Sequence, residues 1–151
     1  MKTKLMGLLV VLALLSGCSK TVLKADSDPN VDIASLQSFY VKKFEPDRRG
    51  LEQVIATKLE ELGYEASSGT GPVPAGVDAV VTYADHWAWD ITNYMLEINI
   101  QFRNPQTDYV ISNGNSYRTS LVRKAPEFMI EETLREMLGK GPMPANSGAG
   151  K

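Results

Sequence analysis

The chain has 151 residues, among them 16 basic and 18 acidic residues, one cysteine and one histidine. The small net charge argues against a nucleic-acid-binding protein, which presents a strongly basic surface. A zinc site needs three or four ligands, usually His or Cys, so His86 alone cannot form one. We therefore expect neither a metal nor a cofactor.

The first residues form a basic and then apolar segment, with Lys2 and Lys4 before a run from Leu5 to Leu15. This run is shorter than the roughly 20 residues that span a bilayer. It is typical of a secretory signal peptide, here residues 1–17. Directly after it, Leu15-Ser16-Gly17-Cys18 places a leucine and two small residues before the only cysteine.

This motif resembles the lipobox of bacterial lipoproteins. The resemblance implies cleavage between Gly17 and Cys18 and acylation of the Cys18 thiol, with membrane lipid as the first partner. Several acyl chains hold a protein on a membrane far more firmly than one. The alternative is an ordinary signal peptide that leaves Cys18 as a free thiol or as an intermolecular disulfide partner.

The residue after the cysteine is Ser19 and not aspartate. By resemblance to the sorting rule of enteric bacteria, this favours the outer membrane, facing the periplasm, over the inner membrane. Without residues 1–17 the chain has 14 basic and 18 acidic residues. Residues 18–34 are polar and lack periodicity, which predicts a flexible tether. We expect one domain over residues 35–139, and a disordered tail over 140–151, which is rich in Gly and Pro.

The first half of the domain predicts a strand, a helix and a second short strand. Aromatic and β-branched residues indicate a strand over Leu36–Phe44. Asp47 can cap a helix over residues 51–62, whose apolar residues recur at helical spacing, and Gly63 suits the end of that helix. Residues 64–67 follow as a short strand before a Gly- and Pro-rich loop.

The second half predicts an antiparallel meander and a final helix. Residues 78–90 form a long strand, and residues 96–103 alternate between apolar and polar side chains, as in a strand with one buried face. Residues 104–108 turn the chain, and residues 109–120 return as a strand, in which Asn113-Gly114 is a bulge rather than a hairpin turn. Pro126 opens the last helix.

This order predicts an α+β two-layer sandwich, with a mainly antiparallel sheet of four to five strands and two helices on one face. The helix between the first two strands allows them to pair in parallel. Together with the lipobox, the segments Phe39-Tyr40-Val41, Leu62-Gly63-Tyr64 and Trp87-Ala88-Trp89-Asp90 resemble those of small uncharacterised proteobacterial lipoproteins. At the level of fold the domain is similar to auxiliary lipoproteins of trans-envelope lipid transporters. The resemblance implies no catalytic residues.

Aromatic residues gather in the strand over residues 78–90 and just after it. Trp87 and Trp89 fall on one face of a strand, and Tyr94 follows. Either both indoles close the core, or the three residues form a recognition surface for a peptide, a glycan or a lipid.

His86, with Asp85 and Asp90, is the only clustered titratable set. A Ser-His-Asp triad would have to use this histidine. The Gly-x-Ser-x-Gly motif that presents a nucleophilic serine is absent from the sequence. We therefore interpret His86 as a structural residue, and we expect no catalytic residues and no enzymatic activity.

These features lead us to expect a binding or scaffolding module of the cell envelope, with an envelope protein as its partner. One alternative is an accessory subunit of an envelope transport or assembly complex. Another is an enzyme that acts on the cell wall or on lipid.

Overall fold

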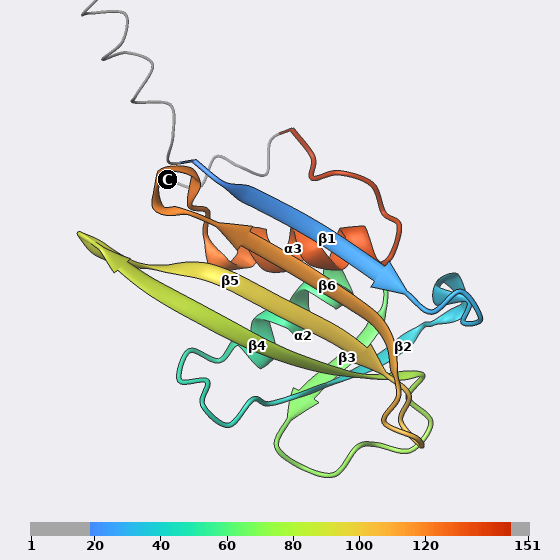
Figure 1. The fold of residues 1–151 in the computed structure, drawn as a ribbon. Coiled ribbons are helices and arrows are strands. Elements are labelled where there is room, and N and C mark those ends of the chain that lie inside the picture. Colours follow the sequence, from blue (N-terminus) through green and yellow to red (C-terminus); the bar gives the residue numbers. More distant parts are fainter. Residues whose placement is uncertain (1–18, 146–151) are drawn as a thin grey trace, which may run out of the picture.

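The computed structural model describes residues 19–145, in which a six-stranded mixed sheet carries two helices on one face (Figure 1). The strand order is β1-β6-β5-β4-β2-β3. The elements are β1 (Thr21–Ser27), η1 (Ile33–Ser35), β2 (Ser38–Lys42), α2 (Leu51–Glu61), β3 (Glu65–Gly69), β4 (Ala79–Asp90), β5 (Thr92–Arg103), β6 (Val110–Arg118), η2 (Ser120–Val122) and α3 (Pro126–Met137). The α+β class is confirmed, although the sheet has more strands than expected. The signal peptide, Cys18 and residues 146–151 lie outside the described residues.

The segment predicted as a tether contains the edge strand β1. It pairs antiparallel with β6 over seven residues, from Thr21 opposite Arg118 to Ser27 opposite Ser112. The prediction of a flexible tether over residues 18–34 is therefore wrong for residues 21–27. An edge strand buries little apolar surface, so its sequence stays mostly polar. In β1 only Val22 and Ala25 are even half-buried.

Two predicted features of the strand pairing are confirmed. β2 lies parallel to β3, and α2 connects the two strands. β2 also pairs in parallel with β4, which the sequence did not indicate. β4, β5 and β6 form an antiparallel meander. The helices cover the face of the sheet that lies behind the strands in Figure 1, with α2 packed against β2 and β3, and α3 packed against β1, β5 and β6.

The core fills the space between the helices and that face of the sheet. Its fully buried large side chains are Phe39, Val41, Ile55, Leu59, Val81, Met95, Ile98, Ile100, Phe102, Met129, Ile130 and Leu134. Ile55 and Leu59 come from the apolar positions at helical spacing in α2, and Ile98, Ile100 and Phe102 from alternate positions in β5, as expected from their periodicity.

Gly63 ends α2 as predicted, but the N-cap position at its start is Gly50 and not Asp47. The Asp47 carboxylate accepts hydrogen bonds from the backbone N–H groups of Arg49 and Leu51, at 2.6 and 2.7 Å. From outside the cap position it thus satisfies the Leu51 N–H, one of the donors that the first turn of a helix leaves open. Gly63 follows the helix with φ of 94°, a conformation that suits glycine.

Gly114 lies within a regular part of β6 and not in a bulge. It pairs with Ile100, and Asn113 pairs with Gln101, so the predicted bulge at Asn113-Gly114 is wrong. A Cβ atom on Gly114 would come within 2.5 Å of the Met137 sulfur and 2.6 Å of Thr133 Cγ2. The glycine is there because α3 approaches the strand closely.

The first residues of the predicted disordered tail fold back on α3. The Arg135 guanidinium donates to the carbonyl oxygens of Lys140 and Gly141, each at 3.2 Å. The Lys140 ammonium lies 4.8 Å from the centre of the Tyr64 ring. The prediction of disorder is therefore wrong for residues 140 and 141.

Replacing Gly114 with alanine should destabilise the domain by about 1–3 kcal/mol, the usual cost of overpacking a core. Urea unfolding followed by circular dichroism measures this difference. Gly71→Ala is the matched control, because no atom lies within 4 Å of a Cβ built there. Equal stabilities of the two variants would show that the packing of α3 on the sheet does not require glycine at position 114.

Candidate functional site

The β4–β5 hairpin positions the three aromatic residues singled out in the sequence. Trp87 lies opposite Met95, and Trp89 lies opposite Asn93. The register shifts between His86 and Trp87, which adds a residue on β5 and twists the hairpin at this point. Beyond the bulge, β5 extends past its last pair with β6, so the hairpin tip projects from the sheet (Figure 1).

Trp87 is a half-buried residue held by its neighbours. Its ring packs against the core, and its indole N–H donates to Asp85 Oδ2 at 2.5 Å. The Arg49 guanidinium carbon lies 3.8 Å from the ring centre, which is a close cation–π contact. This residue therefore fits the expectation that an indole closes the core.

Trp89 behaves differently, because 74% of the residue is exposed. Tyr94 is half-buried, and the Arg123 guanidinium lies 5.8 Å from its ring centre. The three aromatic residues thus do not form one continuous surface. Trp87 and Tyr94 line the groove described next, whereas Trp89 lies outside it.

A groove of about 540 Å³ lies between the β4–β5 hairpin and the start of α3. Its walls include the aromatic rings of Trp87, Tyr94 and Phe128, and its charged lining residues are Lys58, Arg123, Lys124, Glu127 and Glu131. Apolar walls with a few polar groups at the rim are typical of ligand sites.

The cations of the groove differ in how far they are already neutralised. Lys58 pairs with Glu61 at 2.7 Å and with Glu131 at 3.2 Å, and these contacts raise the pKa of Lys58 above its ordinary value. Arg123 donates to the Asp90 carbonyl and to Thr92 Oγ1. Among residues 19–145, Lys124 has no ion-pair partner and lies 5.2 Å from the Phe128 ring centre. Lys124 is therefore the cation most available to an acidic ligand.

The side chains of Asp85, His86 and Asp90 do not form one hydrogen-bonded group. His86 is exposed, and its Nδ1 lies 3.4 Å from Glu97 Oε2. Asp85 accepts from Trp87, and the Asp90 carboxylate accepts from the Ser120 hydroxyl. Because each aspartate has a different partner, neither orients the imidazole as a triad requires.

A buried acidic cluster beside α2 was not anticipated from the sequence. The Tyr83 hydroxyl donates to Asp47 Oδ2 at 2.8 Å, lies 3.4 Å from Glu52 Oε2, and accepts from the Phe44 N–H. Lys43 pairs with Glu52 at 3.4 Å. The cluster joins β4 to the start of α2, and only the position of Asp47 before a helical pattern hinted at it.

The pKa values of this cluster follow from burial and hydrogen bonding. Burial raises the pKa of Tyr83 far above its ordinary value, and the hydrogen bond to Asp47 and the charges of Asp47 and Glu52 add to this effect. Burial also acts to raise the pKa of Asp47. Hydrogen bonds from Arg49, Tyr83 and Leu51 outweigh that effect, so the pKa of Asp47 lies below its ordinary value. The cluster therefore holds an ionised carboxylate at the helix start, where the helix dipole favours one.

A second buried charge joins α3 to the sheet. Glu132 accepts from the Arg118 guanidinium at 3.1 and 2.7 Å and from the Ser116 hydroxyl at 2.6 Å. Two-pronged pairing of this kind satisfies the carboxylate and fixes its geometry. Both partners are therefore engaged in packing α3 on the sheet, and neither lines the groove.

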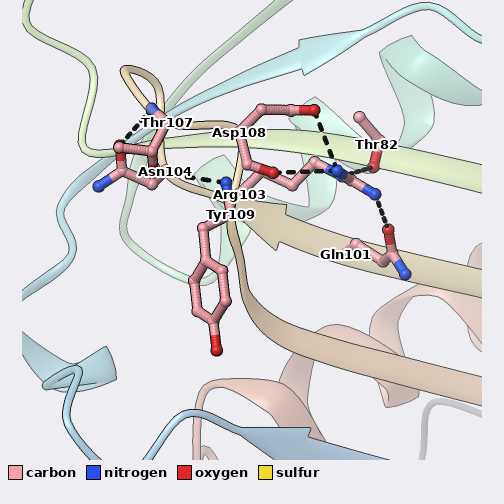
Figure 2. Close-up of polar contacts among 7 residues, drawn as sticks. All are labelled: Thr82, Gln101, Arg103, Asn104, Thr107, Asp108 and Tyr109. Atoms are coloured by element: carbon pink, nitrogen blue, oxygen red, sulfur yellow. Dashed lines mark hydrogen bonds and ion pairs between the residues drawn. The ribbon is translucent and has the colours of Figure 1, made fainter.

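Arg103 forms a polar cluster at the opposite end of the sheet (Figure 2). Its guanidinium donates to Thr82, Gln101 and the Asp108 carboxylate at 3.2, 2.7 and 3.2 Å. Asn104 Oδ1 accepts from the backbone N–H groups of the predicted turn. Each of the three guanidinium nitrogens of Arg103 has a partner, so the cluster stabilises the turn.

In residues 19–145, the part of the chain that the structure describes, no group of His, Cys, Asp and Glu side chains is arranged to hold a metal ion. Within the same residues, no helix is long and apolar enough to cross a membrane.

The fold is similar to that of solved proteins of low sequence identity. A PelC dodecamer from Paraburkholderia phytofirmans matches 79% of this chain and 99% of its own, with a TM-score of 0.58 and 12% identity. A second PelC dodecamer structure from this organism matches 79% and 98%, with a TM-score of 0.56 and 14% identity. A DUF4136 family protein from Bacteroides thetaiotaomicron has a TM-score of 0.49 at 10% identity, over 80% and 95% of the two chains. No family model and no curated protein matches the sequence.

The two tryptophans should differ in their effect on stability. Trp87→Ala should lower the free energy of unfolding by about 2–4 kcal/mol, because it removes a large ring that packs on the core. Trp89→Ala should change it by less than about 0.5 kcal/mol, as is usual for an exposed residue. Chemical unfolding of each variant measures both values. A large loss for Trp89→Ala would contradict its placement outside the core.

Asp47 should make stability depend on pH. Since its folded-state pKa is lowered, its stabilising effect is present above the unfolded value of about 3.9 and is lost as pH falls through the folded value. At pH 7, Asp47→Asn should be less stable than wild type by about 1–2 kcal/mol, because hydrogen bonds to an ionised carboxylate are stronger than those to a neutral amide. Unfolding curves should show this gap closing below about pH 4. A gap that stays constant into the acid range would contradict the argument.

Proposed function

We propose that the protein is a bacterial lipoprotein, held in the outer membrane by acyl chains on Cys18 and facing the periplasm. Its α+β domain acts there as a binding or scaffolding module of the cell envelope. The observation that carries this proposal is the sequence Leu15-Ser16-Gly17-Cys18 behind a basic and apolar segment. Two or more acyl chains attach a protein stably to a membrane.

The groove is the part of the domain best suited to recognition. It combines the rings of Trp87, Tyr94 and Phe128 with the side chains of Arg123 and Lys124. Aromatic residues and arginine are enriched where proteins bind one another. We therefore propose that the groove binds an acidic segment of an envelope protein, and that this segment carries at least one apolar side chain. This arrangement suits an accessory subunit of an envelope transport or assembly complex.

Acylation of Cys18 is tested by labelling cells with an alkyne analogue of palmitate. Wild-type protein should be labelled and should stay with the outer-membrane fraction after washes with salt and alkali. Cys18→Ser should be unlabelled and should leave the membrane, because no acyl chain remains. Unlabelled wild-type protein, or equal retention of both proteins, would contradict lipidation.

Binding at the groove is tested in the same cells with a photo-crosslinking amino acid at Asn93, which lines the groove. Gln53, an exposed residue of α2, is the control position. A defined adduct should form from Asn93 and not from Gln53. Lys124→Glu should weaken it, whereas Lys24→Glu on β1 should not. Equal adducts from both positions would contradict recognition in the groove.

The size of the assembly is measured on the purified lipidated protein. The two similar PelC structures are dodecamers. Native mass of the captured complex gives the number of copies of this chain, and separates self-assembly from binding to a different protein.

A further inference from the structure

Three large apolar residues at one end of the sheet are mostly exposed to solvent. Trp89, Ile91 and Leu121 are 74%, 83% and 72% exposed, the highest values among the exposed large hydrophobic residues. Trp89 and Ile91 belong to the tip of the β4–β5 hairpin, and Leu121 belongs to η2. Exposed apolar residues gathered at one place mark contact surfaces, whereas scattered ones need no explanation.

The two segments that carry these residues touch each other. The Ser120 hydroxyl donates to the Asp90 carboxylate, and Arg123 Nη1 donates to the Asp90 carbonyl and to Thr92 Oγ1, each at 3.3 Å. Asp90 lies between Trp89 and Ile91, and Ser120 precedes Leu121. Trp89, Ile91 and Leu121 thus lie on two segments that contact each other at one end of the sheet, and we call these three residues the apolar end.

Ile91 sits in a backbone conformation that disfavours it. Its φ is 64°, in the left-handed region where glycine and asparagine are common and a β-branched residue is a clear outlier. Its side chain is 83% exposed, so packing within the domain does not explain the choice. Such a conformation at an exposed position points to a role for the side chain outside the domain.

The chain enters the domain beside the apolar end. The Lys20 N–H donates to Thr119 Oγ1 at 2.9 Å, and the Thr119 N–H donates to the Lys20 carbonyl at 3.1 Å. Thr119 is directly followed by η2. Lys20 follows Cys18 by two residues in the sequence, and two residues of extended chain span at most about 7 Å. In Figure 1 the start of β1, the end of β6 and the β4–β5 tip all lie toward the upper left.

The charges near this end suit the surface of a bilayer. Lys20, Arg123 and Lys124 are exposed there, together with the acidic residues Asp90 and Glu127. Tryptophan is enriched at membrane interfaces, and lysine and arginine reach from that depth to the lipid phosphates. The mature chain carries a formal charge of −4 in total, so its acidic excess lies elsewhere in the domain, away from anionic lipid.

We propose that the apolar end lies against the membrane, with Trp89, Ile91 and Leu121 in the headgroup region of an anionic phospholipid bilayer beside the acylated Cys18. The inference rests on the proposed lipidation, because the acyl chains bring this end to the lipid. It goes further in fixing the orientation of the domain. In this orientation the β4–β5 tip contacts the membrane and the sheet extends away from it. The groove then opens close to the membrane surface.

The test uses the two tryptophans of the chain as probes. Lipidated protein is reconstituted into vesicles of phosphatidylethanolamine and phosphatidylglycerol in which part of the lipid carries brominated acyl chains, which quench tryptophan at contact. Wild-type emission should be strongly quenched, and Trp89→Phe should lose most of that quenching, since Trp87 is half-buried above the lipid. This comparison leaves Trp87 and the groove unchanged.

A second set of variants separates the apolar end from general hydrophobicity. Ile91→Asn suits the left-handed backbone, so it should keep or raise the melting temperature while Trp89 quenching falls. Tyr109→Asn is the control, because Tyr109 is 59% exposed at the opposite end. It should leave the quenching unchanged. Equal effects of the two variants would overturn the proposal.

The outcomes also distinguish this inference from the lipidation on which it rests. If the protein floats with the vesicles but Trp89 is not quenched, the protein is anchored and the orientation is wrong. If mass spectrometry finds no acyl chains on Cys18, the proposed lipidation is wrong, and so is the proposed orientation, which rests on it. If Trp89 emission shifts to the blue with rising protein concentration without lipid, the apolar end is a contact between copies, which also overturns the proposal.

Discussion

The pairing of β1 with β6 is the constraint on which the rest of the structure depends. It begins at Thr21, three residues after Cys18, and continues for seven residue pairs. Because the strand starts so close to the proposed anchor, little flexible chain separates the domain from the membrane. The Lys20–Thr119 hydrogen bonds close the remaining gap at the end of the sheet. Lys20, two residues after Cys18 in the sequence, is thereby fixed at one end of the sheet.

The same pairing organises the interior. α3 packs across β1, β6 and β5, and it can approach the sheet because Gly114 has no side chain. Glu132 reaches from α3 to Arg118, the residue opposite Thr21. Helix, edge strand and buried ion pair therefore support one another. Removing one partner of such a pair is strongly destabilising, because the other charge is left buried. The start of α3 lines the groove, so the same contacts hold that wall of the groove in place.

Periodicity and local signals were enough to predict most of the fold. The helix between Asp47 and Gly63, the alternation in β5 and the turn over residues 104–108 all follow from side chains that act within a few residues. β1 was not predicted because residues 21–27 are mostly polar and lack an apolar period, and only pairing with a strand about 90 positions away makes them a strand. Gly114 was misassigned for a related reason, since the helix it accommodates comes later in the chain.

The candidate site was predictable only in part. The sequence placed Trp87 and Trp89 on one face, but the bulge after His86 and the end of β6 leave one half-buried and the other exposed. Arg123, Lys124 and Phe128 were missed, because they reach the groove from the segment after β6. An exposed isoleucine with a positive φ also has no sequence signature. These features depend on contacts between residues that lie far apart in the sequence, and a single sequence gives little indication of such contacts.

Amide hydrogen exchange in the lipidated protein on vesicles tests the central claim most directly. If β1 is part of the sheet, the alternate amides of Thr21–Ser27 that face β6 exchange slowly, with protection similar to that of β6 itself. The domain is then held at the membrane by a short connection. Exchange at the rate of an unstructured peptide throughout residues 21–27 would show that this segment is a tether, and would contradict the account.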